Sequence, residues 1–367
     1  EWLTRRIPVL ERLNIPAPIA GGLVYAVAIA LMRGRVVNFE FDLTLRDFLM
    51  IAFFTTIGLE ASFGLLKDAG RLGGVFLLLA TAGAVLQNVL GAGVVMLFGL
   101  DPLLGVISGS AALTGGPATA LAFGPTFEKL GVAAASTVGL ACATFGITIA
   151  GLLGGFVGGR MIRRHKLKAD AVLPVHGHDH DTHHTALLPN AVAVAAAMGI
   201  GSLISAAIER AGVVLPAYIG AMLAAAAIRN MDDRFGMLRL SNRHISMMGN
   251  VALSFFVVMA LLGLRLWELA NLALPVAAAL AAQVALVWVL CLLTFRVMGR
   301  DYEAAVMSAG YCGFMLGTTA SALASMHELE RQHGPAPQAF IVVPVIGAFL
   351  IDFTNALVIT AAMNLMR

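Results

Sequence analysis

Long apolar stretches with few charged residues dominate the chain. A membrane-crossing helix needs ~20 mostly apolar residues, and most of the stretches reach that length. None alternates apolar and polar residues over about ten positions, as a strand of a membrane β-barrel would. The pattern predicts an all-α polytopic membrane protein. The apolar stretches are 13–32, 48–66, 72–100, 102–127, 130–159, 182–208, 211–228, 244–264, 269–295, 304–327 and 332–366.

Composition supports this class and excludes others. Only 12% of the 367 residues are charged and 59% are hydrophobic, whereas an average soluble domain carries ~25% charged residues. So few charges could not cover the surface of an ordinary water-soluble enzyme. The net charge of +3 is too mild to indicate nucleic-acid binding. The three cysteines form no CxxC pair and lie in apolar runs, so neither a disulfide framework nor a thiolate metal site is expected.

Two of the apolar stretches carry small and polar residues at their centres. Segment 102–127 contains Thr114-Gly115-Gly116-Pro117, and segment 304–327 contains Gly317-Thr318-Thr319. Because Gly and Pro weaken or break helices, each segment is predicted to be a re-entrant hairpin of two half-helices joined by a tip. A kinked spanning helix is the alternative. Broken helices near the membrane midplane are typical of transporters.

An internal repeat relates the two halves. Gly99, Asp101 and Ser108 match the residues 200 positions later, in one register with other matches. The first half lacks a partner for 187–208, so we expect a helix before Glu1 that is missing from this chain. Each full repeat would then hold five transmembrane helices and one re-entrant hairpin. Since five is odd, the second repeat is expected to have inverted topology.

The distribution of basic residues favours this topology. If the basic tail after 159 is cytoplasmic and both broken segments are hairpins, most of the 24 Lys and Arg residues fall inside, as the positive-inside rule requires. If both broken segments instead crossed the membrane completely, the distribution of basic residues would no longer agree with this rule. The predicted division is an N-terminal repeat at 1–164, a His/Asp-rich linker at 165–186 and a C-terminal repeat at 187–367. The linker could bind Zn²⁺ or Ni²⁺, but a solvated cytoplasmic linker is the favoured interpretation.

Candidate chemistry concentrates at the two tips. Enzyme and ATP-binding motifs such as HExxH, GxSxG and GxxxxGK[ST] are absent, so no enzymatic activity is predicted. Free N–H groups and helix N-terminal dipoles attract carboxylates, and two opposed tips suit a ligand with two anionic ends. Tight helix packing is the alternative role for the small residues. The candidate substrate-binding residues are Ser108, Ser110, Thr114, Gly115, Gly116, Thr119, Gly313, Gly317, Thr318, Thr319 and Ser321.

An acidic residue in the middle of a span points to a cation. Asp352 lies in an apolar run, where a bare charge is costly and needs a partner or a task. Carboxylate, amide and carbonyl oxygens suit a hard cation such as Na⁺; proton carriage and a hydrogen bond between helices are the alternatives. Glu60, near a span end, is expected to face water. The candidate Na⁺ ligands are Asp352, Asn355, Asn88, Asn250 and Thr55.

Eight motifs follow one another along essentially the whole chain: Phe53–Leu59, Gln87–Asn88, Leu100–Leu103, Ala141–Gly146, Gly249–Val251, Leu266–Ala270, Gly310–Phe314 and Asp352–Ile359. Together they resemble the bacterial sodium/glutamate symporter family. The tips at 115–119 and 319–321 depart from the pattern of that family, so the exact substrate stays open.

The resemblance implies a secondary transporter in the bacterial inner membrane. Its substrate would be L-glutamate or a similar acidic amino acid, with Na⁺ as coupling ion and no organic cofactor. By analogy with other carriers built on paired hairpins, we expect a homodimer in the lipid bilayer that works as an elevator. The hairpins and spans 130–159 and 337–366 would move. The alternatives are a dicarboxylate or other organic-anion carrier, H⁺-coupled or not, and an anion channel.

Overall fold

The computed structural model describes residues 44–62, 69–169, 187–210, 216–262 and 272–366, with positions 21, 22, 24–26, 29, 32, 42, 64, 67 and 264. Within this part of the chain every regular element is a helix, which confirms the all-α prediction. The α-helices are α4 (Thr44–Glu60), α6 (Gly70–Met96), α7 (Pro102–Val106), α8 (Gly116–Lys129), α9 (Ala135–His165), α10 (Leu187–Arg210), α11 (Ala217–Phe235), α12 (Asn242–Leu262), α13 (Ala273–Val297), α14 (Tyr302–Leu316), α15 (Thr319–His333), α16 (Pro337–Val345) and α17 (Ile351–Leu365); η1 (Ile107–Ala111) and η3 (Ile346–Leu350) are π-helical.

Five of the described helices are long and apolar enough to cross a membrane, judged by length and composition. They are α6, α9, α10, α12 and α13. α4 has 17 residues, and the last part of α11 is charged around Arg229–Arg234. The His/Asp-rich linker predicted at 165–186 lies outside the described residues from 170 onward.

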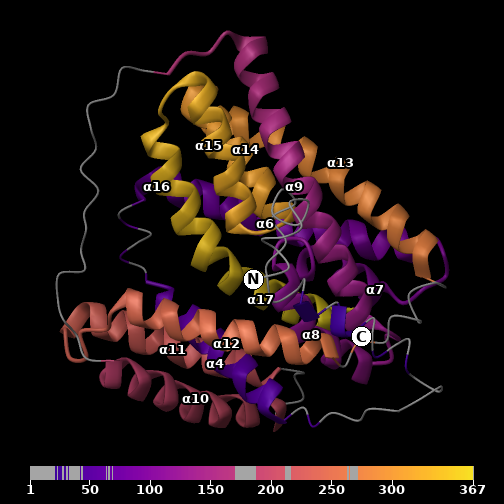
Figure 1. The fold of residues 1–367 in the computed structure, drawn as a ribbon, viewed down its shortest axis with the longest axis vertical. Coiled ribbons are helices and arrows are strands. Elements are labelled where there is room, and N and C mark those ends of the chain that lie inside the picture. Colours follow the sequence, from indigo (N-terminus) through magenta and orange to yellow (C-terminus); the bar gives the residue numbers. More distant parts are fainter. Residues whose placement is uncertain are drawn as a thin grey trace.

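The helices form two groups (Figure 1). α4, α10, α11 and α12 lie side by side in one layer, here called the four-helix layer. Small residues bring these helices close, since a Cβ on Gly201 would lie 2.1 Å from Ala221 Cα, and one on Gly58 would lie 2.3 Å from Met222 O. The remaining helices, α6 to α9 and α13 to α17, pack mainly against one another and are here called the hairpin body.

α6 and α13 run antiparallel inside the hairpin body. A Cβ on Gly83 would lie 3.4 Å from Leu290, whereas one on Gly91 would lie 3.1 Å from Gln283. Residue numbers therefore rise along α6 as they fall along α13, and the two helices end at opposite ends of the pair. The broken segments that follow them, starting at residues 102 and 302, consequently begin at opposite ends of the hairpin body.

Both segments divide into two helices, as the small-residue pattern predicts. In the first, α7 passes into η1 and α8 starts at Gly116; in the second, α14 ends at Leu316 and α15 starts at Thr319. The two segments begin alike, because Asp101 and Asp301 each accept a hydrogen bond from a backbone N–H of the first turn, at 2.8 Å and 2.7 Å. That these hairpins turn back within the membrane stays a prediction, as does the inverted repeat.

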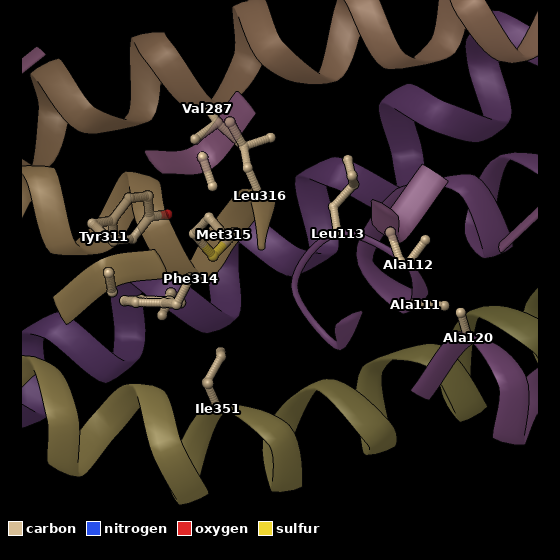
Figure 2. Packing of buried hydrophobic residues seen from close by; sticks show 14 of the residues in the cluster. Ala111, Ala112, Leu113, Ala120, Val287, Tyr311, Phe314, Met315, Leu316 and Ile351 are labelled. Atoms are coloured by element: carbon tan, nitrogen blue, oxygen red, sulfur yellow. The ribbon is translucent and has the colours of Figure 1, made fainter. Parts of the chain in front are cut away.

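An apolar core surrounds the tips (Figure 2). Leu113 beside the first tip and Met315 and Leu316 beside the second are buried together with Tyr311 and Phe314. α9 approaches so closely that a Cβ on Gly146 would lie 2.1 Å from Leu316 O. Dense packing of this kind fixes the backbone of the two breaks.

Candidate functional site

The two hairpin tips touch each other. A Cβ built on Gly116 would lie 3.5 Å from Gly317 O and 3.6 Å from Thr318 Cγ2. Gly116 has φ of +68°, a left-handed conformation that other residues rarely adopt. A glycine at this position thus lets the chain turn into α8 next to the second tip.

A cavity of about 310 Å³ adjoins both tips, a volume in the range of small-molecule sites. The hairpin body contributes Gly115, Pro117, Ala118, Thr119, Thr318 and Asp352 to its lining. α4 and α12 form the other wall with Phe53, Ile57, Asn250, Leu253, Ser254 and Val257. The cavity therefore lies between the hairpin body and the four-helix layer.

The cavity offers binding groups for both signs of charge. α8 and α15 start at it, and helix N-termini attract anions through free N–H groups and the helix dipole. Thr318 caps α15, its Oγ1 accepting from Ser321 N at 3.4 Å. Asp352 is the only ionisable residue among those that line the cavity. Its carboxylate is therefore the one charged group there that could bind a positive group of a ligand.

A larger hollow of about 610 Å³ lies elsewhere, where the ends of α8 and α12 meet the start of α9. Arg46, Glu128 and Lys129 line it, and it contains none of the tip residues. Charged residues at helix ends are expected at a membrane–water boundary, so the smaller cavity at the tips is the better candidate site.

A group of buried polar side chains lies behind the first tip and is here called the amide cluster: Gln87, Asn88, Ser110, Gln283 and Asn355, all buried. Gln87 ties the tips together. Its Oε1 accepts from Thr114 Oγ1 at 2.5 Å, and its Nε2 donates to Met315 O at 2.8 Å. Gln283 Nε2 in turn donates to Gln87 O at 2.7 Å.

The amide cluster also clamps the backbone of Ser110. Ser110 N donates to Asn88 Oδ1 at 3.1 Å, and Asn355 Nδ2 donates to Ser110 O at 3.0 Å. Four buried atoms of this cluster then have no hydrogen-bond partner among the described residues: Asn88 Nδ2, Ser110 Oγ, Gln283 Oε1 and Asn355 Oδ1. An unsatisfied buried polar group costs about 1–3 kcal/mol. Three of the four are oxygens, the type of ligand that a hard cation takes.

The other predicted substrate-binding residues have varied surroundings. Ser108 is turned into its own helix, with Oγ donating to Leu104 O at 2.8 Å. Gly313 serves helix packing, because its missing Cβ would lie 2.3 Å from Ala322 Cα. Thr319 Oγ1 donates to Gly347 O of η3 at 2.6 Å. These three contribute to the frame of the tips, whereas Gly115, Thr119 and Thr318 line the cavity.

Four of the five predicted Na⁺ ligands fall into two places. Asp352 and Asn250 line the cavity, while Asn88 and Asn355 belong to the amide cluster. Asp352 and Asn355 are three residues apart on α17 and hence neighbours on its surface. Thr55 belongs to neither place, since its Oγ1 donates to Ile51 O of the same helix at 2.7 Å.

The prediction for one side chain was wrong, and a second side chain of the site was not predicted at all. Glu60 was expected to face water, and this was wrong: it is buried, 7% exposed, and accepts a hydrogen bond from Ser246 Oγ. The physical reason is that α4 packs between α11 and α12, with Gly58 of its last turn against Met222 of α11 and Glu60 bonded to Ser246 of α12. Gln283 was not singled out, although an amide in the middle of the apolar stretch 269–295 is a signal that could have found it.

Comparison with known proteins finds a family and relatives that match most of the chain. The family model described as sodium/glutamate symporter matches residues 1–335. A sodium/glutamate symporter from Escherichia coli (strain K12) is 38% identical over 370 residues, covering 97% of this chain and 92% of that protein. One from Haemophilus influenzae (strain ATCC 51907 / DSM 11121 / KW20 / Rd) is 35% identical over 368 residues, covering 97% and 91%.

These relatives settle the class of protein. Symporters are transporters and not enzymes, which confirms the prediction made from the missing catalytic motifs. With its apolar helices, the protein is a multi-pass protein of the bacterial inner membrane. The chain therefore belongs to the sodium/glutamate symporter family.

Proposed function

We propose that this protein carries L-glutamate, or a similar acidic amino acid, across the membrane together with Na⁺. The observation that carries this proposal is the cavity at the tips, where two helix N-termini and one carboxylate converge. Glutamate has two carboxylates and one ammonium group, so its charges match the cavity in number and sign. The names of the relatives support the same pair of solutes.

In this proposal each tip binds one carboxylate. The start of α8, from Gly115 to Thr119, takes one, and the start of α15 at Thr318 takes the other. Small residues at both starts let the ligand approach the backbone N–H groups. The ammonium group lies toward Asp352, whose carboxylate would otherwise be unpaired among the cavity residues.

Na⁺ binds next to this site, between Asp352 and the amide cluster. The unpartnered oxygens of Ser110, Gln283 and Asn355 are its neutral ligands, and Asp352, one turn from Asn355, supplies the negative charge. Bound Na⁺ would hold Ser110 and thus the first tip in place, so that glutamate finds its site already formed. Coupling then follows because each ligand stabilises the conformation that binds the other.

Transport requires the site to open alternately to each side. We propose an elevator-type movement in which the hairpin body slides against the four-helix layer, because the cavity lies between these groups. The two inverted repeats would place one re-entrant hairpin on each side of the membrane. The four-helix layer would form the contact between the subunits of a homodimer; α10 exposes Leu188 and Leu203 at 71% and 73%, available to a second subunit or to lipid.

The direct test is uptake of labelled L-glutamate into proteoliposomes containing the purified protein. Accumulation above the outside concentration is expected with an inward Na⁺ gradient and not when choline replaces Na⁺. Uptake driven by a pH gradient in choline would instead indicate H⁺ coupling. Stronger competition by glutarate or succinate than by aspartate would indicate a dicarboxylate carrier. Ionic current without accumulation would indicate a channel and contradict the proposal.

A further inference from the structure

Another cavity carries a cluster of positive charges and includes none of the tip residues. It measures about 400 Å³ and lies where the C-terminal ends of α9 and α13 come together. Arg160 and Arg164 line it from α9, and Arg296 and Arg300 line it from α13 and the turn after it. No acidic residue belongs to its lining, and within the described residues none of these arginines forms an ion pair.

Local backbone structure gathers the four arginines. Arg160 and Arg164 are four residues apart and share one face of α9. The chain turns back after α13, where Gly299 has φ of +127° and Arg300 N donates to Phe295 O at 3.1 Å. This turn keeps Arg300 next to the last turn of α13, which carries Arg296. Guanidinium groups bind phosphate in a bidentate manner, so a cluster of four arginines favours a phosphate-bearing ligand.

Below the charged rim the cavity is apolar and open to the outside. Trp288 and Leu292 of α13 line it and are 43% and 37% exposed. Both α9 and α13 are long and apolar enough to span a membrane, so this apolar wall would face the hydrocarbon region. A ligand that fits both parts has an anionic head and an apolar tail.

We propose that this cavity binds the phosphate headgroup of an anionic phospholipid, with an acyl chain along Trp288 and Leu292. The excess of Lys and Arg places these helix ends on the cytoplasmic side, where the leaflet is rich in anionic lipid and basic pockets between helices bind lipid headgroups. A soluble phosphate would satisfy the arginines but would leave the apolar wall unused.

Trp288 provides a reporter for the test. Trp2 and Trp267 are replaced by Phe, so that emission comes from Trp288 alone, and the protein is reconstituted in phosphatidylcholine. Phosphatidylglycerol or phosphatidylcholine with brominated acyl chains is then added in increasing mole fraction. Brominated phosphatidylglycerol is expected to quench at a mole fraction at least tenfold lower than brominated phosphatidylcholine does.

Two double variants separate the cavity from general surface charge. Arg160→Gln with Arg296→Gln should remove most of this preference, since each basic residue near an anionic surface contributes about fivefold. Arg163→Gln with Arg239→Gln makes the same change in charge outside the cavity and should retain it. Equal quenching by the two lipids, or equal loss in both double variants, would overturn the proposal. Displacement of the lipid by millimolar inorganic phosphate would assign the site to a soluble anion and overturn it as well.

Discussion

The two hairpins, hairpin 1 (α7, η1 and α8) and hairpin 2 (α14 and α15), begin alike and end differently. Both start with an aspartate that caps the first helix, yet the first leg of hairpin 1 becomes π-helical and leaves the helical region at Gly109, with φ of −95° and ψ of −122°. The first leg of hairpin 2 stays α-helical up to Leu316. π-Helical turns are rare overall but frequent at functional sites.

The partners of the tips explain this difference. Hairpin 1 is held by side chains of other helices, since Asn88 and Asn355 bind the backbone of Ser110. Hairpin 2 has its own cap, Thr318, and one side chain of another helix holds its backbone, since Gln87 Nε2 donates to Met315 O. We infer a division of labour in which the distorted hairpin joins the Na⁺ site to the substrate site, whereas the regular hairpin contributes a substrate-binding helix terminus.

The largest effect is expected at Asp352, where the two sites adjoin. Asp352→Asn keeps the shape of the side chain but removes the charge, and removal of one partner of a buried charge pair costs about 2–5 kcal/mol. Na⁺-dependent uptake should fall at least about 30-fold. Glu328→Gln, an exposed acid on α15, is the control. Na⁺ dependence equal to that of the wild type in Asp352→Asn would remove this residue from the ion site.

A substitution at the first tip should weaken the binding of substrate. Gly116→Ala introduces a side chain at φ of +68°, which costs about 1–2 kcal/mol and shifts the start of α8. The KM for glutamate should rise about tenfold in uptake assays. Gly93→Ala, a helical glycine with no atoms within 4 Å of the added Cβ, should leave KM unchanged. A similar rise in KM in both variants would show that the conformation of the tip does not affect substrate binding.

Two serines of hairpin 1 differ in the hydrogen bonding of their side chains. Ser110 Oγ is buried without a partner among the described residues, whereas Ser108 Oγ is bound by its own helix. Ser110→Ala should raise the Na⁺ concentration for half-maximal uptake about fivefold, because a ligand oxygen is lost. Ser108→Ala should leave it unchanged. An effect of Ser108→Ala as large as that of Ser110→Ala would speak against a Na⁺ ligand at Ser110.

An effect of the same size is expected at the cap of hairpin 2. Thr318→Val removes the hydroxyl that caps α15, worth about 1 kcal/mol, so the affinity for glutamate should fall about fivefold with little change in Na⁺ affinity. Thr294→Val is the matched control, since that hydroxyl binds Leu290 O of its own helix. A change in Na⁺ affinity alone would contradict the roles inferred for the two hairpins, because it would place hairpin 2 at the Na⁺ site.

The sequence predicted the breaks in both hairpins but not their details. Glycine and proline disfavour helix locally, so the positions of the breaks are predicted by Gly115-Gly116-Pro117 and by Gly317. The π-helical turn before Ala112 depends on long-range contacts with Asn88 and Asn355, which no local pattern reveals. The prediction for Glu60 was wrong for the same reason, because its burial is determined by α11 and α12, which follow more than a hundred residues later in the chain.

In the function proposed above, glutamate occupies the cavity between the hairpin tips and α12 in the presence of Na⁺. Ser254 lines this cavity from α12, and the three native cysteines are buried. The rate at which a methanethiosulfonate reagent modifies Ser254→Cys therefore reports access to the cavity. We predict that saturating L-glutamate slows this reaction at least about tenfold in Na⁺ and not in choline. An unchanged rate with glutamate and Na⁺, in protein that still transports glutamate, would contradict the account.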